Sequence, residues 1–125
     1  MKKHLAILLW AADADQPHLC STPFFHAAAA AAMDTEVEIY FTGRSINLLR
    51  RGVAAALPSG PRGRESVYGF MRHAAEHGAR FFACSEAMQE HDLARADLIE
   101  EVCAVGGAAA FIGRTLDREW ATLIY

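Results

Sequence analysis

Three cysteines and six histidines are the residues of this chain whose types could carry out chemistry. Cys84 is the best placed, because it ends an apolar stretch typical of a buried strand and precedes a polar helical turn, residues 85–89. Backbone N–H groups at the start of a helical turn favour the thiolate, which is the nucleophilic form of cysteine. Glu86 and Glu90 oppose this effect, so we expect a modestly activated thiol; the alternative is a buried, inert cysteine.

The other two cysteines are weaker candidates. Cys20 lies between the first predicted strand and the first predicted helix, and therefore at the same sheet edge as Cys84. It either forms a disulfide with Cys84 or packs within its loop, and we expect packing. Spacing alone cannot place two Cα atoms within the ~7 Å that a disulfide needs. Cys103 falls inside a short predicted strand, so we expect it in the core.

The histidines raise the possibility of a metal site. His73, Glu76 and His77 have the H-x-x-E-H spacing of some zinc enzymes. Gly78 ends this helix at once and no distal ligand is evident, so we expect the two histidines to interact with the helix dipole instead. His91, seven residues after Cys84, either steers a substrate or is a solvated loop residue, and the second is favoured. We therefore predict no metal and no cofactor.

Composition narrows the class of protein. The 125 residues are 53% hydrophobic and 22% charged, which predicts one globular domain over residues 1–125. The net charge of -3 argues against a general nucleic-acid binder. No apolar run approaches the roughly 20 residues that span a bilayer. Residues 60–63 lack the lysine of a P-loop, and no G-x-G-x-x-G follows the first predicted strand.

The first residues allow two interpretations. Lys2 and Lys3, the apolar run 5–12 and the tripeptide 12–14 imitate a secretory signal with its cleavage site. The alternative, which we favour, is a buried strand over residues 4–10, because the apolar stretch is short and no polar segment follows it. An odd number of cysteines suits a reducing compartment, so we expect a cytoplasmic protein.

Short apolar runs alternate along the chain with segments of helical spacing, which predicts a mostly parallel sheet with helices on both faces. Such sheets bind ligands beyond the carboxyl ends of their strands. Thr22 is expected to cap the first helix, and Ser66 the helix that Gly78 ends. The predicted strands are residues 4–10, 37–42, 79–84, 102–105 and 120–124. The predicted helices are residues 22–32, 45–51, 66–77, 85–89, 93–99 and 106–116, the last packed through Ala108, Phe111 and Ile112, and residues 58–64 form a loop.

Charge is distributed unevenly. Residues 44–64 contain five arginines and no acid, whereas residues 86–101 contain six acids and one arginine. These segments are either ordinary solvated faces or complementary surfaces, between identical subunits or toward a small charged partner.

The stretches G-A-R-F-F-A-C-S-E-A-M (78–88) and A-V-G-G-A-A-A-F (104–111) resemble the DsrE/DsrF-like family of small sulfur-transfer proteins. In that family a strand ends in A-C-x-x-S or a close variant followed by methionine, and V-x-G-A-A-x-F begins the last helix. The order of elements is similar over essentially the whole chain. Here Ser85 directly follows Cys84, whereas the family serine often comes later.

The resemblance implies an α/β fold, an αβα sandwich around a mostly parallel five-stranded sheet that is flavodoxin-like in outline, and assembly as homotrimers or homohexamers. It implies a sulfurtransferase in which Cys84 takes sulfane sulfur from a small donor as a persulfide. A TusA-like carrier or another sulfurtransferase then receives the sulfur, in sulfur oxidation or sulfur trafficking. Ser85, Met88 and His91 are candidate contacts of the substrate or persulfide, His91 on its spacing from Cys84 alone. Two alternatives stay open: a non-catalytic subunit of a sulfur-trafficking complex, or a redox sensor using Cys84 and Cys20.

Overall fold

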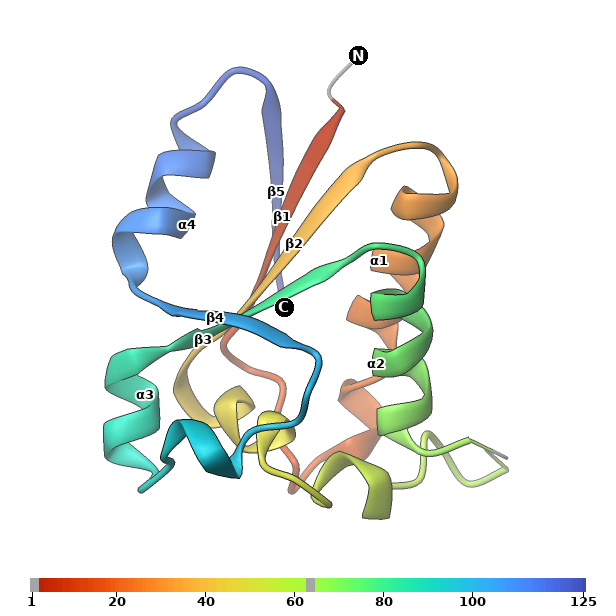
Figure 1. Cartoon of the computed structure of the whole chain (residues 1–125). Helices are drawn as coiled ribbons and strands as arrows, with labels where there is room; N and C mark the ends of the chain where they lie inside the picture. Colours follow the sequence, from red (N-terminus) through yellow and green to blue (C-terminus); the bar gives the residue numbers. More distant parts are fainter. Residues whose placement is uncertain (1–2, 63–64) are drawn as a thin grey trace.

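The computed structural model describes residues 3–62 and 65–125. It contains one sheet of five parallel strands in the order β4-β3-β2-β1-β5 (Figure 1). The predicted α/β fold is therefore confirmed. The strands are β1 (His4–Leu9), β2 (Glu36–Phe41), β3 (Arg80–Cys84), β4 (Val102–Gly106) and β5 (Trp120–Ile124).

Helices cover both faces of the sheet. Helices α1 (Thr22–Ala32) and α2 (Val67–Glu76) lie together on one face, and α4 (Ala108–Thr115) lies on the other (Figure 1). The short helix α3 (Ser85–Glu90) continues directly from the carboxyl end of β3. The described part of the chain also contains four 3-10 segments: η1 (Pro17–Leu19), η2 (Gly43–Leu49), η3 (Ala54–Ala56) and η4 (Arg95–Asp97).

The main core lies between the sheet and the pair α1 and α2. The first predicted strand lies inside the sheet, where β1 pairs with β2 on one side and with the edge strand β5 on the other. Phe24 of α1 stacks on Phe41 of β2, with ring centroids 6.0 Å apart, and Phe41 lies 5.3 Å from Phe81 of β3. Each such buried aromatic side chain contributes roughly 2–3 kcal/mol by burial alone. This core fixes the sheet that carries the candidate site.

The helix boundaries follow local chemistry, with one correction. Ser66 caps α2 as predicted, since its hydroxyl accepts a hydrogen bond from the backbone N–H of Gly69 at 3.1 Å. Gly78 follows the end of α2 with φ at 102°, a conformation that favours glycine. The prediction for Thr22 is wrong: Ser21 occupies the N-cap of α1 and makes no capping hydrogen bond, while Thr22 already lies inside the helix.

Three other predicted helices differ from the structure. In place of the helix predicted over residues 45–51, the structure has the 3-10 segment η2, which begins and ends two residues earlier. Residues 93–99 form only the 3-10 turn η4, because Leu93, Leu98 and Ile99 anchor an otherwise extended segment to the core. Residues 106–107 precede α4, and only Phe111 of its predicted packing residues is buried. Ala108 and Ile112 are exposed. Lys2 and the end of the predicted loop 58–64 lie outside the described residues.

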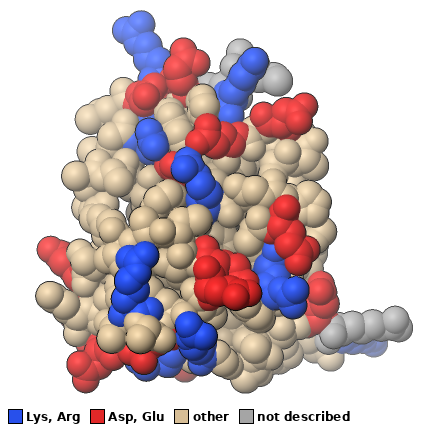
Figure 2. Space-filling model, in the orientation of Figure 1, with Lys and Arg blue, Asp and Glu red and all other residues tan. Residues whose placement is uncertain are grey.

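The two charged segments lie against each other within one chain. The backbone N–H of Arg51 donates to the carbonyl of Asp97 at 2.9 Å, and that of Ile99 donates to Leu49 at the same distance. The Arg50 guanidinium donates to the carbonyl of His91 at 3.0 Å. Figure 2 shows positive and negative side chains interspersed on the face in view. Arg64 of the basic segment lies outside the described residues.

None of the described helices is long and apolar enough to cross a membrane.

Candidate functional site at the carboxyl ends of the strands

Cys84 lies where the sequence places it, at the carboxyl end of β3. It pairs in register with Gly106 at the end of β4 and occupies the N-cap of α3, with φ −71° and ψ 123°. The thiol is free and its residue is half-buried, so it is neither sealed in the core nor fully solvated. A half-buried thiol at a strand end can meet a small substrate while one side stays in contact with protein.

Cys84 forms part of the wall of an apolar pocket between the sheet and α4. The pocket has a volume of about 280 Å³. Its wall crosses the ends of all five strands, from Leu8 of β1 to Ile124 of β5, and continues over Phe111 and Ile112 of α4. Gly106 and Gly107 add only backbone to the wall beside Cys84. The pocket therefore offers a thiol in a hydrophobic recess, a surface suited to nucleophilic attack on an apolar substrate.

Cys20 is fully buried in the loop between β1 and α1. Its thiol donates hydrogen bonds to the carbonyls of Asp13 at 3.3 Å and Gln16 at 3.6 Å. Burial raises the pKa of the Cys20 thiol, and the nearby Asp13 carboxylate adds to this effect, although the backbone hydrogen bond opposes it. A buried thiol with a raised pKa is a poor nucleophile at neutral pH.

The prediction that Cys103 belongs to the core is wrong, because its side chain is exposed. The register between β3 and β4 shifts here: Phe81 faces Val102 and Phe82 faces Ala104, which leaves Cys103 without a partner residue on β3. A bulge of this kind on an edge strand turns the extra side chain away from the regular pleat. Its thiol approaches only the carbonyl of Glu101, at 3.8 Å.

A buried carboxylate that is not among the predicted site residues lies on the face of the sheet that α4 covers, which is also the face of the Cys84 pocket. Glu38 of β2 has a side chain only 2% exposed. Its oxygens accept hydrogen bonds from the Tyr40 hydroxyl at 2.6 Å and the Arg80 guanidinium at 2.9 Å. Arg114 of α4 adds a two-pronged contact at 2.9 and 3.1 Å. The signal was present in E-V-E-I-Y-F, where Glu36, Glu38 and Tyr40 alternate with apolar residues and so share one face.

This cluster joins α4 to the sheet. Burial alone would raise the pKa of Glu38, but hydrogen bonds from Arg114 and Tyr40 and the charges of both arginines lower it below its usual range. Burial, the hydrogen bond to Glu38 and its negative charge raise the pKa of Tyr40 to about 12. The Arg114 guanidinium also lies 4.1 Å from the ring centroid of Trp120. The carboxylate is therefore held ionised, and both arginines are already paired.

The DsrE/DsrF-like family profile matches residues 6–121. The chain belongs to the DsrE/DsrF-like family. Three solved structures show the same fold as this family member. A protein of unknown function, MTH1491 from Methanobacterium thermoautotrophicum, has a TM-score of 0.70 and 19% identity over 98% of both chains. The ychN protein from E. coli has a TM-score of 0.67 and 13% identity over 100% of both chains.

The third structure is BT1422 from Bacteroides thetaiotaomicron, a conserved protein of unknown function. It has a TM-score of 0.69 and 13% identity, and the alignment covers 98% of this chain and 95% of that one. No curated protein matches the DsrE/DsrF-like chain in sequence. At these identities the structural comparisons establish the fold alone.

The structure separates the three residues that were candidate contacts of a substrate at Cys84. Ser85 is exposed at the first position of α3, next to the thiol. Met88 is buried in the main core and does not line the pocket. His91 ends α3, and its ring lies 3.3 Å from the Asn47 amide of η2. Of the three, only Ser85 is adjacent to Cys84.

The two histidines of the H-x-x-E-H stretch engage in local contacts. A ring nitrogen of His77 lies 2.8 Å from the His73 carbonyl oxygen, and the two rings are 4.3 Å apart. Glu76 pairs instead with Arg72 at 3.6 Å. Within residues 3–62 and 65–125, no group of three or more His, Cys, Asp or Glu side chains is arranged to hold a metal ion.

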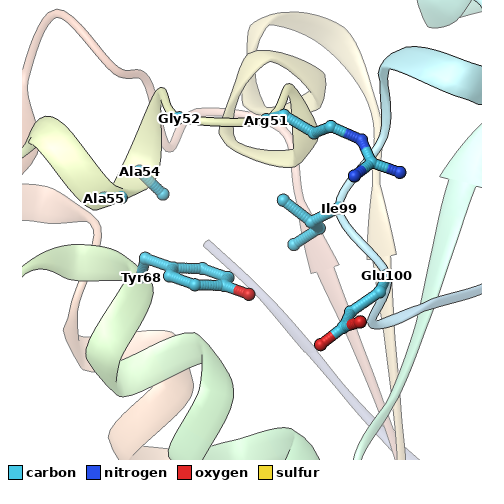
Figure 3. A pocket seen from close by; sticks show the side chains of 7 residues that line it. All are labelled: Arg51, Gly52, Ala54, Ala55, Tyr68, Ile99 and Glu100. Atoms are coloured by element: carbon cyan, nitrogen blue, oxygen red, sulfur yellow. The ribbon is translucent and has the colours of Figure 1, made fainter.

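A second cavity lies where the two charged segments meet. Its volume is about 220 Å³, and Arg51 and Glu100 lie on one side of it with Tyr68 opposite (Figure 3). The Tyr68 hydroxyl donates to the two carboxylate oxygens of Glu101 at 2.8 and 2.9 Å. Partial burial and this carboxylate raise the pKa of Tyr68 to about 12. The cavity contains no thiol, so the pocket at Cys84 is the better candidate for the chemistry of this family.

Proposed function

We propose that this protein is a sulfurtransferase, in which Cys84 accepts a sulfane sulfur as a persulfide and passes it to a carrier protein such as a TusA-like protein. The observation that carries the proposal is the half-buried Cys84 thiol in the wall of a pocket at the carboxyl ends of the strands. Membership of the DsrE/DsrF-like family supports a role in sulfur relay. The pathway served is sulfur oxidation or sulfur trafficking in the cytoplasm.

The reaction needs only one thiol. The Cys84 thiolate attacks the terminal sulfur of a donor R–S–SH, and a new S–S bond forms while the donor S–S bond breaks. The electron pair of the broken bond leaves with R–S⁻, and Cys84 becomes Cys84–S–SH without net oxidation or reduction. In the second half, a thiolate of the acceptor attacks the outer sulfur and Cys84 thiolate is released.

The positions of Cys20 and Cys103 favour this exchange over disulfide formation within the chain. Cys20 is fully buried and hydrogen-bonded through its thiol, so it cannot meet Cys84 unless its loop moves. Cys103 precedes the Cys84 partner Gly106 by three positions on β4, a separation of about 10 Å along the strand, beyond the ~7 Å reach of a disulfide. These placements weigh against a redox sensor that cycles between two thiols of one chain.

Assembly into a homotrimer or homohexamer belongs to the same proposal. Several large hydrophobic side chains are exposed on a single chain of this small protein, and an assembly would cover them. Those that lie outside the Cys84 pocket and away from α4 are Trp10, Leu19, Phe25, Met33 and Leu123.

Mass spectrometry after incubation with polysulfide tests the proposal. We expect adducts of about 32 Da per sulfur on wild type, mapped to Cys84 by peptide analysis. The adduct on that peptide should persist in Cys20→Ser and Cys103→Ser and vanish in Cys84→Ser. Transfer of labelled sulfur from the loaded protein to a TusA-like carrier then separates a relay from a protein that only stores sulfur.

Three results contradict the proposal or one of its parts. Absence of any adduct on Cys84 rules out the transferase. A loss of about 2 Da that requires both Cys84 and Cys20 indicates the redox sensor instead. Loading without onward transfer to any thiol acceptor favours a non-catalytic subunit of a sulfur-trafficking complex.

A further inference from the structure

The wall of the Cys84 pocket is almost entirely hydrophobic. Among the residues that the structure describes, none that lines it carries a charge. Tyr40 and Thr42 are the lining residues with a hydroxyl, and the Tyr40 hydroxyl already donates to Glu38 at 2.6 Å. An ionic group that entered the pocket would lose its water without gaining a charged partner, which is strongly unfavourable.

The arginines that contact Glu38 on this face of the sheet are already paired, so they are not available to an anionic donor. Arg80 and Arg114 both contact the Glu38 carboxylate, at 2.9 Å in each case, and Arg80 also pairs with Glu36 at 2.7 Å. Neither arginine lines the pocket. The residues of α3 that follow Cys84 do not line the pocket, so an anionic sulfur donor such as thiosulfate would find no guanidinium inside it to replace its hydration.

We infer that the sulfur donor of Cys84 is a persulfide whose organic group is uncharged and apolar. This inference rests on the proposed function. The terminal sulfur of R–S–SH meets the Cys84 thiolate, and the group R lies against Phe111 and Ile112. A volume of about 280 Å³ equals that of roughly nine water molecules at ~30 Å³ each, enough for an aromatic or short aliphatic group. The donor leaves as R–S⁻ after the balanced exchange given above.

The test compares two persulfides that differ in R with thiosulfate, from which the thiolate takes the outer sulfur and sulfite leaves. Benzyl persulfide has an apolar group, glutathione persulfide carries carboxylates, and thiosulfate is an inorganic dianion. The second-order rate of Cys84 loading is measured in a Cys103→Ser background by quenched alkylation and intact mass. Each rate is divided by the rate of the same donor with N-acetylcysteine, which removes differences in intrinsic reactivity. We expect the normalised rate for benzyl persulfide to exceed the other two by at least about tenfold.

Two matched variants connect this preference to the pocket. Ile112 lines the pocket and is 51% exposed, and Leu116, four residues later at the C-cap of α4, is 80% exposed and does not line it. Ile112→Lys places a cation at the pocket, so we expect it to reduce the preference for benzyl over glutathione persulfide about tenfold. Leu116→Lys adds the same charge outside the pocket and is expected to keep the wild-type preference.

The outcomes separate the inference from the function on which it rests. If all donors load Cys84 with equal normalised rates, or the anionic donors load it faster, the donor class is wrong while the transferase stands. If Leu116→Lys changes the preference as much as Ile112→Lys, the pocket is not the origin of the selectivity. If no donor loads Cys84, the proposed function is wrong and the inference falls with it.

Discussion

Glu38 gives the strongest quantitative prediction, because it is a buried charge with four hydrogen bonds. Glu38→Gln keeps the shape of the side chain and removes the charge. One amide position still accepts a hydrogen bond, but the NH₂ group now faces guanidinium donors of Arg80 and Arg114. The variant loses two charge-assisted hydrogen bonds, one from each arginine. At about 1.5–3 kcal/mol each, their loss would lower the free energy of unfolding by about 3–6 kcal/mol. The side chains of Arg80 and Arg114 are 45% and 37% exposed, so their guanidiniums regain hydrogen bonds to water. We therefore expect the free energy of unfolding to fall by about 2–3 kcal/mol.

The assay is urea unfolding at pH 7, with wild type and variant at the same protein concentration because an assembly makes the midpoint concentration-dependent. Glu36→Gln is the matched control. Glu36 lies on the same strand and also pairs with Arg80, but its side chain is 46% exposed. An exposed ion pair contributes 1 kcal/mol or less, so the control is expected to lose no more than about that amount.

The pH dependence follows from the lowered pKa of Glu38. A carboxyl whose pKa is lower in the folded than in the unfolded protein stabilises the fold above its unfolded value, here an ordinary 4.5. That contribution is lost as the pH falls through the folded pKa, where Glu38 becomes neutral like glutamine. The difference in free energy of unfolding between wild type and Glu38→Gln should therefore shrink below pH 4.5. A loss no larger than that of Glu36→Gln at pH 7, or a gap unchanged at pH 3, would refute the reasoning.

Two further predictions concern thiol access and helix capping. Iodoacetamide should alkylate Cys103 and Cys84 in the folded protein, whereas the buried Cys20 should react only after denaturation. Labelling of Cys20 in the folded protein would show that its loop opens. Ser66→Ala should lower the free energy of unfolding by about 1 kcal/mol, because α2 loses its cap. Thr22→Ala, at an exposed position that caps nothing, should change it by less than about 0.5 kcal/mol, and equal effects in urea unfolding would contradict both assignments.

Local sequence patterns predicted the elements that position the site. The continuous apolar run of β1 indicated a strand covered on both faces, and the rule for parallel sheets placed Cys84 at the edge where ligands bind. Cys103 could not be placed in the same way, because its exposure depends on a register shift against β3. The ligands of Glu38 were equally out of reach: Arg80 and Arg114 lie 42 and 76 residues away in sequence, so no local pattern pairs them.

The charge cluster and the apolar pocket are two ends of one interface beneath α4. Arg114 binds Glu38 at one end of the helix, while Phe111, one turn earlier, lines the pocket. Tyr40 joins the two ends, since its hydroxyl donates to Glu38 while its ring stacks on Phe82 at 5.0 Å within the pocket wall. Glu38 pairs with Arg80 and Arg114 at the other end of this interface, and neither arginine lines the pocket. The selectivity inferred for Cys84 therefore depends on the apolar wall itself, and α4 holds that wall in place through its contact with Glu38.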